Sequence, residues 1–93
     1  MKTRNFIDVI KSTPLGRRIY QRQTLQLQIT ETLCGEMNAR RISRKDMAGK
    51  IKISEKSLSN MLNGVTEIDI RKVSDILTEM DLQLLIDTEK IPK

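Results

Sequence analysis

The side chains best suited to recognition chemistry in this sequence lie close together near its middle. They are polar and mostly short: Glu55, Lys56, Ser57, Ser59 and Asn60. Side chains of these types pair with base edges in the major groove of double-stranded DNA, lysine with guanine, asparagine with adenine and a carboxylate with cytosine. We therefore predict that Lys56 and Asn60 read base edges, and that Ser57 and Ser59 add contacts to bases or phosphates.

Positive charge is concentrated around these residues. Residues 40–56 contain seven lysines and arginines against two acidic residues, Asp46 and Glu55. Residues 1–50 carry a net charge of +7, whereas residues 51–93 carry −2. Such a cluster is the expected signature of phosphate binding, although a run of charges can also be a merely solvated surface. The predicted phosphate contacts, which fix position without reading sequence, are Ser43, Arg44, Lys45, Lys50, Lys52, Asn63 and Thr66.

Glu55 is an unusual residue for such a surface, because phosphates repel a carboxylate. It fits if it accepts a hydrogen bond from cytosine N4 or pairs with a cation. Arg44 is the predicted cation, since it begins the preceding helix.

Two short helices joined by a tight turn are predicted to position these side chains. Ser43 and Ser54 are residues of the type that caps a helix N-terminus. Asn63 and Gly64 tolerate left-handed backbone and are predicted to end the second helix. Apolar residues at helical spacing are predicted to hold the two helices at a steep angle: Met47, Ala48, Ile51, Ile53, Leu58, Met61 and Leu62.

The stretch from Ile42 to Met80 resembles, without gaps, the helix-turn-helix of the Cro/C1-type (Xre) family of bacterial and phage regulators. The resemblance implies an all-α, five-helix, lambda-repressor-like domain that binds an inverted-repeat operator as a homodimer and represses transcription, including that of its own promoter. Two positions depart from the family pattern. Lys52 stands where glycine is usual, so a non-glycine residue is expected to adopt a positive φ, and Gly49 weakens the first helix by about 1 kcal/mol. An ordinary helical hairpin with a solvated polar face, or an adaptor that binds only protein, are the alternatives.

The whole chain is predicted to divide into three parts, 1–38, 39–80 and 81–93, of which the second contains the helix-turn-helix. In the first, a short helix is expected at Thr3–Lys11, although its apolar residues also fit a strand. Thr13 and Pro14 then start a long helix that runs to about Asn38. In the second part, Asp69 caps a packing helix behind the helix-turn-helix.

The tail at 82–86 alternates apolar and polar residues, as a β-strand does, with Leu82, Leu84 and Ile86 on one face. A lone strand needs a partner, and the simplest partner is the same strand of a second copy, so these residues are the predicted dimer interface. This ending is similar to that of HipB-type antitoxins, which implies a toxin protein as a second partner. The alternative is that residues 82–86 extend the last helix.

Several function classes are disfavoured by what the sequence lacks. It contains no histidine and a single cysteine, Cys34, which removes the usual general bases, disulfides and cysteine metal clusters. We therefore expect no enzyme, no cofactor and no metal site. Because no apolar run approaches a membrane span and no signal peptide opens the chain, we expect a cytoplasmic protein without a membrane partner.

Overall fold

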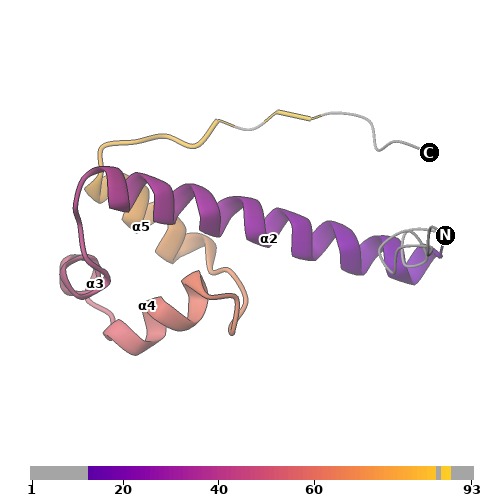
Figure 1. Cartoon of the computed structure of the whole chain (residues 1–93), viewed down its shortest axis with the longest axis horizontal. Coiled ribbons are helices and arrows are strands. Elements are labelled where there is room, and N and C mark those ends of the chain that lie inside the picture. Colours follow the sequence, from indigo (N-terminus) through magenta and orange to yellow (C-terminus); the bar gives the residue numbers. More distant parts are fainter. Residues whose placement is uncertain (1–12, 86, 89–93) are drawn as a thin grey trace, which may run out of the picture.

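The computed structural model describes residues 13–85 and 87–88, and in these residues the fold is all-α, as predicted. Four helices follow one another: α2 (Pro14–Ala39), α3 (Arg44–Ile51), α4 (Glu55–Leu62) and α5 (Ile70–Glu79). The described residues thus form four helices and not the predicted five, since the short helix expected at Thr3–Lys11 lies outside them. Figure 1 shows α2 as a long rod, with α3, α4 and α5 gathered beside its C-terminal half.

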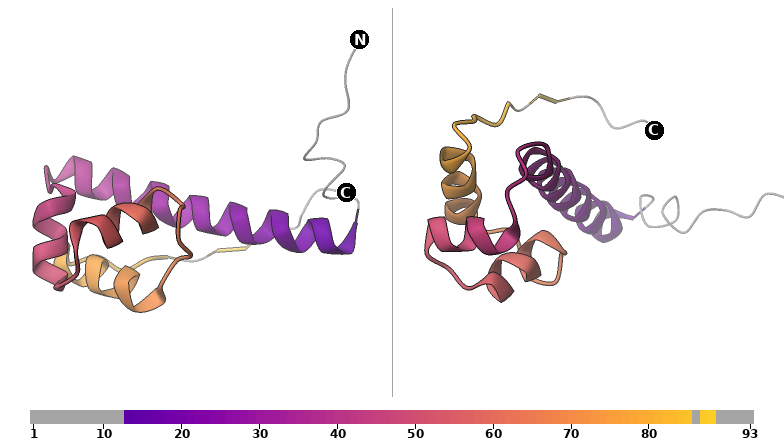
Figure 2. Two further views of the ribbon diagram at one scale, coloured as in Figure 1. Left: turned by 90° about the horizontal axis from the view of Figure 1, so that it is seen from below. Right: turned by 60° about the vertical axis from the view of Figure 1, so that its left-hand side comes forward.

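Helix α2 is 26 residues long and begins where the sequence indicates. The Thr13 Oγ1 atom accepts a hydrogen bond from the Gly16 N–H at 3.0 Å, and Pro14 occupies the first helical position. Only the C-terminal part of the helix enters the core, through Leu33 and Met37. The N-terminal part extends past the other helices (Figure 2), and Leu15 is 67% exposed there.

The core is built from aliphatic and methionine side chains contributed by all four helices. The side chains of Met47, Leu58 and Ile76, from α3, α4 and α5, are fully buried at its centre. Ala48 is also buried, at 2% exposure, as expected for a small residue at a helix crossing. The predicted inner faces of α3 and α4 are therefore confirmed.

Three helices end in the same way, with a non-glycine residue in the left-handed region. These residues are Arg41, Lys52 and Asp81, with φ values of 56°, 63° and 57°. In each case the next residue donates its N–H to the carbonyl five positions back, at 2.9–3.0 Å, and packs its side chain on the core. This pattern is the Schellman motif, which normally uses glycine. The positive φ expected at Lys52 is confirmed.

The predicted C-terminal strand is absent from the described part of the tail, where residues 82–85 have no regular secondary structure. The Leu82 N–H donates to the Leu77 carbonyl at 2.9 Å, so this amide completes the end of α5 and is not available to begin a strand. Leu82 and Leu84 are half-buried, whereas Leu85 is 89% exposed. Ile86 lies outside the described residues. None of the four described helices combines the length and the apolar character needed to cross a membrane.

Candidate nucleic-acid interface

The outward face of α4 carries the predicted base-reading residues. Leu58, Met61 and Leu62 are buried, and residues about 100° apart along a helix place Lys56 and Asn60 on the opposite side. Lys56 is exposed and Asn60 is half-buried. The Asn60 backbone carbonyl oxygen accepts from the N–H groups of Val65 and Thr66. Its side-chain amide makes no hydrogen bond to the described residues. Both side chains are therefore accessible to a partner.

The first turn of α4 is tied to α5. The Ser54 Oγ atom caps the helix by accepting from the Ser57 N–H at 3.0 Å. The Ser57 Oγ atom in turn accepts from the Lys72 ammonium at 3.1 Å. Lys72 is half-buried and brings a positive charge to the N-terminal end of the polar face. Ser57, predicted to contact bases or phosphates, is thus already paired with a cation.

Lys72 is the residue that sequence reasoning missed. It belongs to α5, which was expected only to pack behind the helix pair. A signal was present, because Lys72 precedes the buried Ile76 by one helical turn and so lies on the same side of α5. A long side chain at the edge of a buried face reaches over the neighbouring helix with its charged end in water.

The other end of α4 is tied to α3. The Arg44 guanidinium donates to the Asn63 side-chain oxygen at 3.0 Å, which brings together two of the predicted phosphate contacts. The ion pair found within the described residues is Arg40–Glu36, so the predicted pairing of Arg44 with Glu55 is wrong. Asn63 is the C-cap of α4 and Glu55 its first residue. A cation is favoured at the negative C-terminal end of a helix and a carboxylate at its positive N-terminal end, so each charge occupies a suitable position without the other.

Further cations lie on α3 and at its end. Lys45 and Lys50 line one shallow hollow of about 470 Å³, together with Arg41 and Asp46. The Ser43 Oγ atom accepts from the Asp46 N–H at 3.0 Å, so the predicted cap is confirmed. Its hydroxyl proton can still be donated to a phosphate oxygen. Lys52, at the turn between α3 and α4, is exposed.

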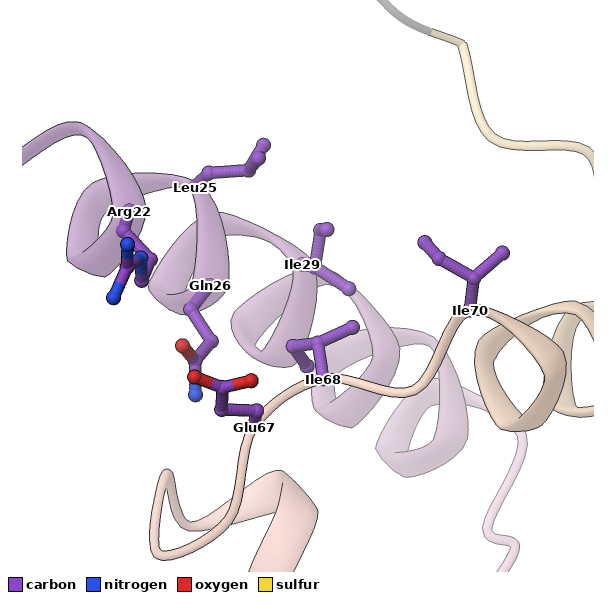
Figure 3. Close-up of a pocket in the computed structure, with 7 residues that line it drawn as sticks. All are labelled: Arg22, Leu25, Gln26, Ile29, Glu67, Ile68 and Ile70. Carbon is purple, nitrogen blue, oxygen red and sulfur yellow. The ribbon is translucent and has the colours of Figure 1, made fainter. Parts of the chain in front are cut away.

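The loop between α4 and α5 is held against α2. The Gln26 side-chain amide donates to the Thr66 carbonyl oxygen at 3.2 Å, 40 residues away in sequence. Thr66 itself is exposed. A groove of about 440 Å³ lies beside this contact. Figure 3 shows Arg22, Gln26 and Glu67 at its polar end, Ile29, Ile68 and Ile70 at its apolar end, and Leu25 near Arg22 but pointing away from the polar side chains.

The chemistry available at this surface is hydrogen bonding and charge attraction. Within residues 13–85 and 87–88, no three His, Cys, Asp or Glu side chains are grouped so as to hold a metal ion. Cys34 is half-buried on α2 and packs against the core. No family model, curated protein or solved structure matches the chain.

Proposed function

We propose that this chain is a sequence-specific DNA-binding repressor that places α4 in the major groove. One observation carries the proposal: the polar face of α4 has a cation hydrogen-bonded at each end, Lys72 through Ser57 and Arg44 through Asn63. With its side chains an α-helix is about 10–12 Å across, which fits the width of the major groove, about 12 Å. Cations at the two ends of α4 match the phosphates that border the groove on both sides.

Roles follow from position on this face. Lys56 and Asn60, at its centre, read guanine and adenine. Glu55, at the exposed first turn, accepts a hydrogen bond from cytosine N4. Ser59, with its short side chain, adds a contact to a base or a phosphate. Arg44 keeps unused N–H donors besides the one given to Asn63, so the pair can clamp a phosphate together. The remaining predicted phosphate contacts are Ser43, Lys45, Lys50, Lys52 and Thr66.

The repressor is proposed to act as a homodimer in the cytoplasm. Two copies would meet across a two-fold axis through the apolar side chains of their tails, with Leu84 and Ile86 beside Leu82 and without pairing as strands. Support comes from exposed apolar side chains, since Leu85 in the tail is 89% exposed and Ile70 at the start of α5 is 71% exposed. Two α4 helices would then enter successive major grooves about 34 Å apart on an inverted repeat.

Selection of bound sites from random duplex DNA, with the mass in solution measured alongside, tests this function. A two-part symmetric site and a dimeric mass are expected. Asn60→Ala should relax the preference at particular base pairs, whereas Lys45→Ala should weaken all sequences alike. The proposal fails if the wild-type chain binds no duplex even at 20 mM salt, or if Asn60→Ala leaves the selected site unchanged.

The second candidate function is that of an antitoxin that also binds a toxin protein. It is favoured by large apolar side chains exposed outside the α4 face, among them Leu15, Leu25 and Ile70. A neighbouring gene whose product co-purifies with this chain would support it. The partner complex should then form with Lys56→Ala as well as with the wild type, since that substitution alters only the DNA face.

A further inference from the structure

We infer that the DNA-binding surface extends from the helix-turn-helix onto the N-terminal half of α2, where Arg22 and Arg18 contact phosphates. The inference rests on the proposed function and deepens it, because it adds a third element to the same interface. Neither arginine belongs to the part of the chain that resembles the family motif. The contact between α2 and the loop after α4 carries the inference.

The loop and α2 meet beside the predicted phosphate contacts. Arg22 and Gln26 line a hollow of about 520 Å³ together with Asn63 and Thr66. The hydrogen bond from Gln26 to the Thr66 carbonyl fixes the loop to α2 at this point. Figure 3 shows Arg22 one turn before Gln26, with its guanidinium at the polar end of the neighbouring groove. A DNA strand that touches Thr66 therefore passes within reach of Arg22.

The direction of each arginine follows from helix geometry. With about 100° per residue, Arg22 lies about 20° from the direction of the buried Leu33, and Arg18 about 60° from it. Arg17 lies about 160° away and points to the opposite side of α2. Arg18 precedes Arg22 by about 6 Å along the axis of α2, a separation that suits contacts to neighbouring phosphates of one DNA strand. Arg18 and Arg22 thus form a short basic row that continues from the loop.

Charge along α2 agrees with this row. Residues 14–30 contain three arginines and no acidic residue. Arg18 and Arg22 are both exposed, and neither is in an ion pair within the described part of the chain. One carboxylate opposes the phosphates, because Glu67 lines the same two hollows as Arg22. Glu67→Gln removes this negative charge and should therefore tighten DNA binding.

The test compares the salt dependence of binding to one random-sequence duplex for the wild type, Arg18→Ala, Arg22→Ala and Arg17→Ala. Arg17→Ala is the matched control, since it removes the same charge from the same helix on the opposite face. Each phosphate contact contributes about 0.9 to the slope of log affinity against log salt. If the contact contributes nothing to affinity at 1 M salt, loss of Arg22 should weaken binding about 15-fold at 50 mM salt and about fourfold at 200 mM. Arg18→Ala should behave similarly, and Arg17→Ala should change the slope by less than about 0.3.

Three results would overturn the inference. Equal losses for Arg17→Ala and Arg22→Ala would indicate diffuse attraction without a contact. Wild-type slopes for both Arg18→Ala and Arg22→Ala would confine the DNA contacts to the helix-turn-helix and exclude α2 from the interface. A looser complex with Glu67→Gln would contradict the placement of phosphates at this groove. Failure of the wild-type chain to bind any duplex would instead refute the proposed function, so the two failures are distinguishable. Unchanged melting temperatures would show that the variants are folded.

Discussion

Lys52 allows stability and DNA affinity to be separated with a single substitution. Its φ of 63° places it in the left-handed region at the C-terminal end of α3. That conformation costs an ordinary L-residue about 1–2 kcal/mol, whereas glycine adopts it without steric penalty. Glycine also makes the unfolded chain more flexible, and this cancels about 0.4–1 kcal/mol of the stability gained by relieving the strain. Lys52→Gly should therefore raise the free energy of unfolding by about 0.5–1 kcal/mol.

The same substitution removes an exposed cation predicted to contact phosphate. Lys52→Gly should lower the slope of log affinity against log salt by about 0.9 and weaken binding to all sequences alike. A more stable protein with weaker DNA binding is the expected combination. A gain of 0.5–1 kcal/mol corresponds to a rise of about 2–8 °C in Tm for a domain of this size.

Lys52→Ala is the control, because it removes the charge but keeps the Cβ atom that makes the left-handed region unfavourable. It should weaken DNA binding as much as Lys52→Gly while leaving Tm within a few degrees of the wild type. Melting should be followed by circular dichroism at one fixed protein concentration, since dimerisation makes Tm concentration-dependent. A Tm of Lys52→Gly below that of the wild type would refute the reasoning, as would a Tm of Lys52→Ala equal to that of Lys52→Gly.

Three further substitutions test other parts of the molecule. Asn60→Ala should cost about 1–3 kcal/mol of binding to the selected operator and much less on random DNA, as measured by titration of both duplexes. Lys72→Ala should weaken binding several-fold in a salt-dependent way, and an unchanged salt slope would show that Lys72 only positions Ser57. Ser54→Ala removes the N-cap of α4 and should lower the free energy of unfolding by about 0.5–2 kcal/mol in urea titrations, whereas Ser59→Ala should change it by less than about 0.5 kcal/mol.

The local features of this fold could be predicted because their causes lie within a few residues. The caps at Thr13, Ser43, Ser54 and Asp69 each accept from an N–H two or three positions ahead. The positive φ of Lys52 was expected from the resemblance instead, because the Cro/C1-type family usually has glycine at this turn. The buried faces of α3 and α4 follow from helical spacing alone.

The contacts that complete the candidate site could not be predicted in the same way. The bonds from Arg44 to Asn63 and from Lys72 to Ser57 join residues 19 and 15 positions apart. They depend on the angles at which the helices cross, which spacing along one helix does not determine. The tail was misjudged for a different reason. An apolar residue just after a helix fits either the first position of a strand or the last contact of a Schellman motif, and Leu82 takes the second role.

The uneven burial of α2 has a consequence for its amide hydrogens. Residues near Leu33 are shielded by the core and should exchange with deuterium only when the whole domain opens, whereas those near Leu15, 67% exposed, should exchange through local fraying. One continuous helix would thus show a steep gradient of protection from one end to the other. A ligand that binds the exposed N-terminal turns of α2 should slow amide exchange in those turns selectively. Deuterium labelling would therefore locate its binding site without any substitution.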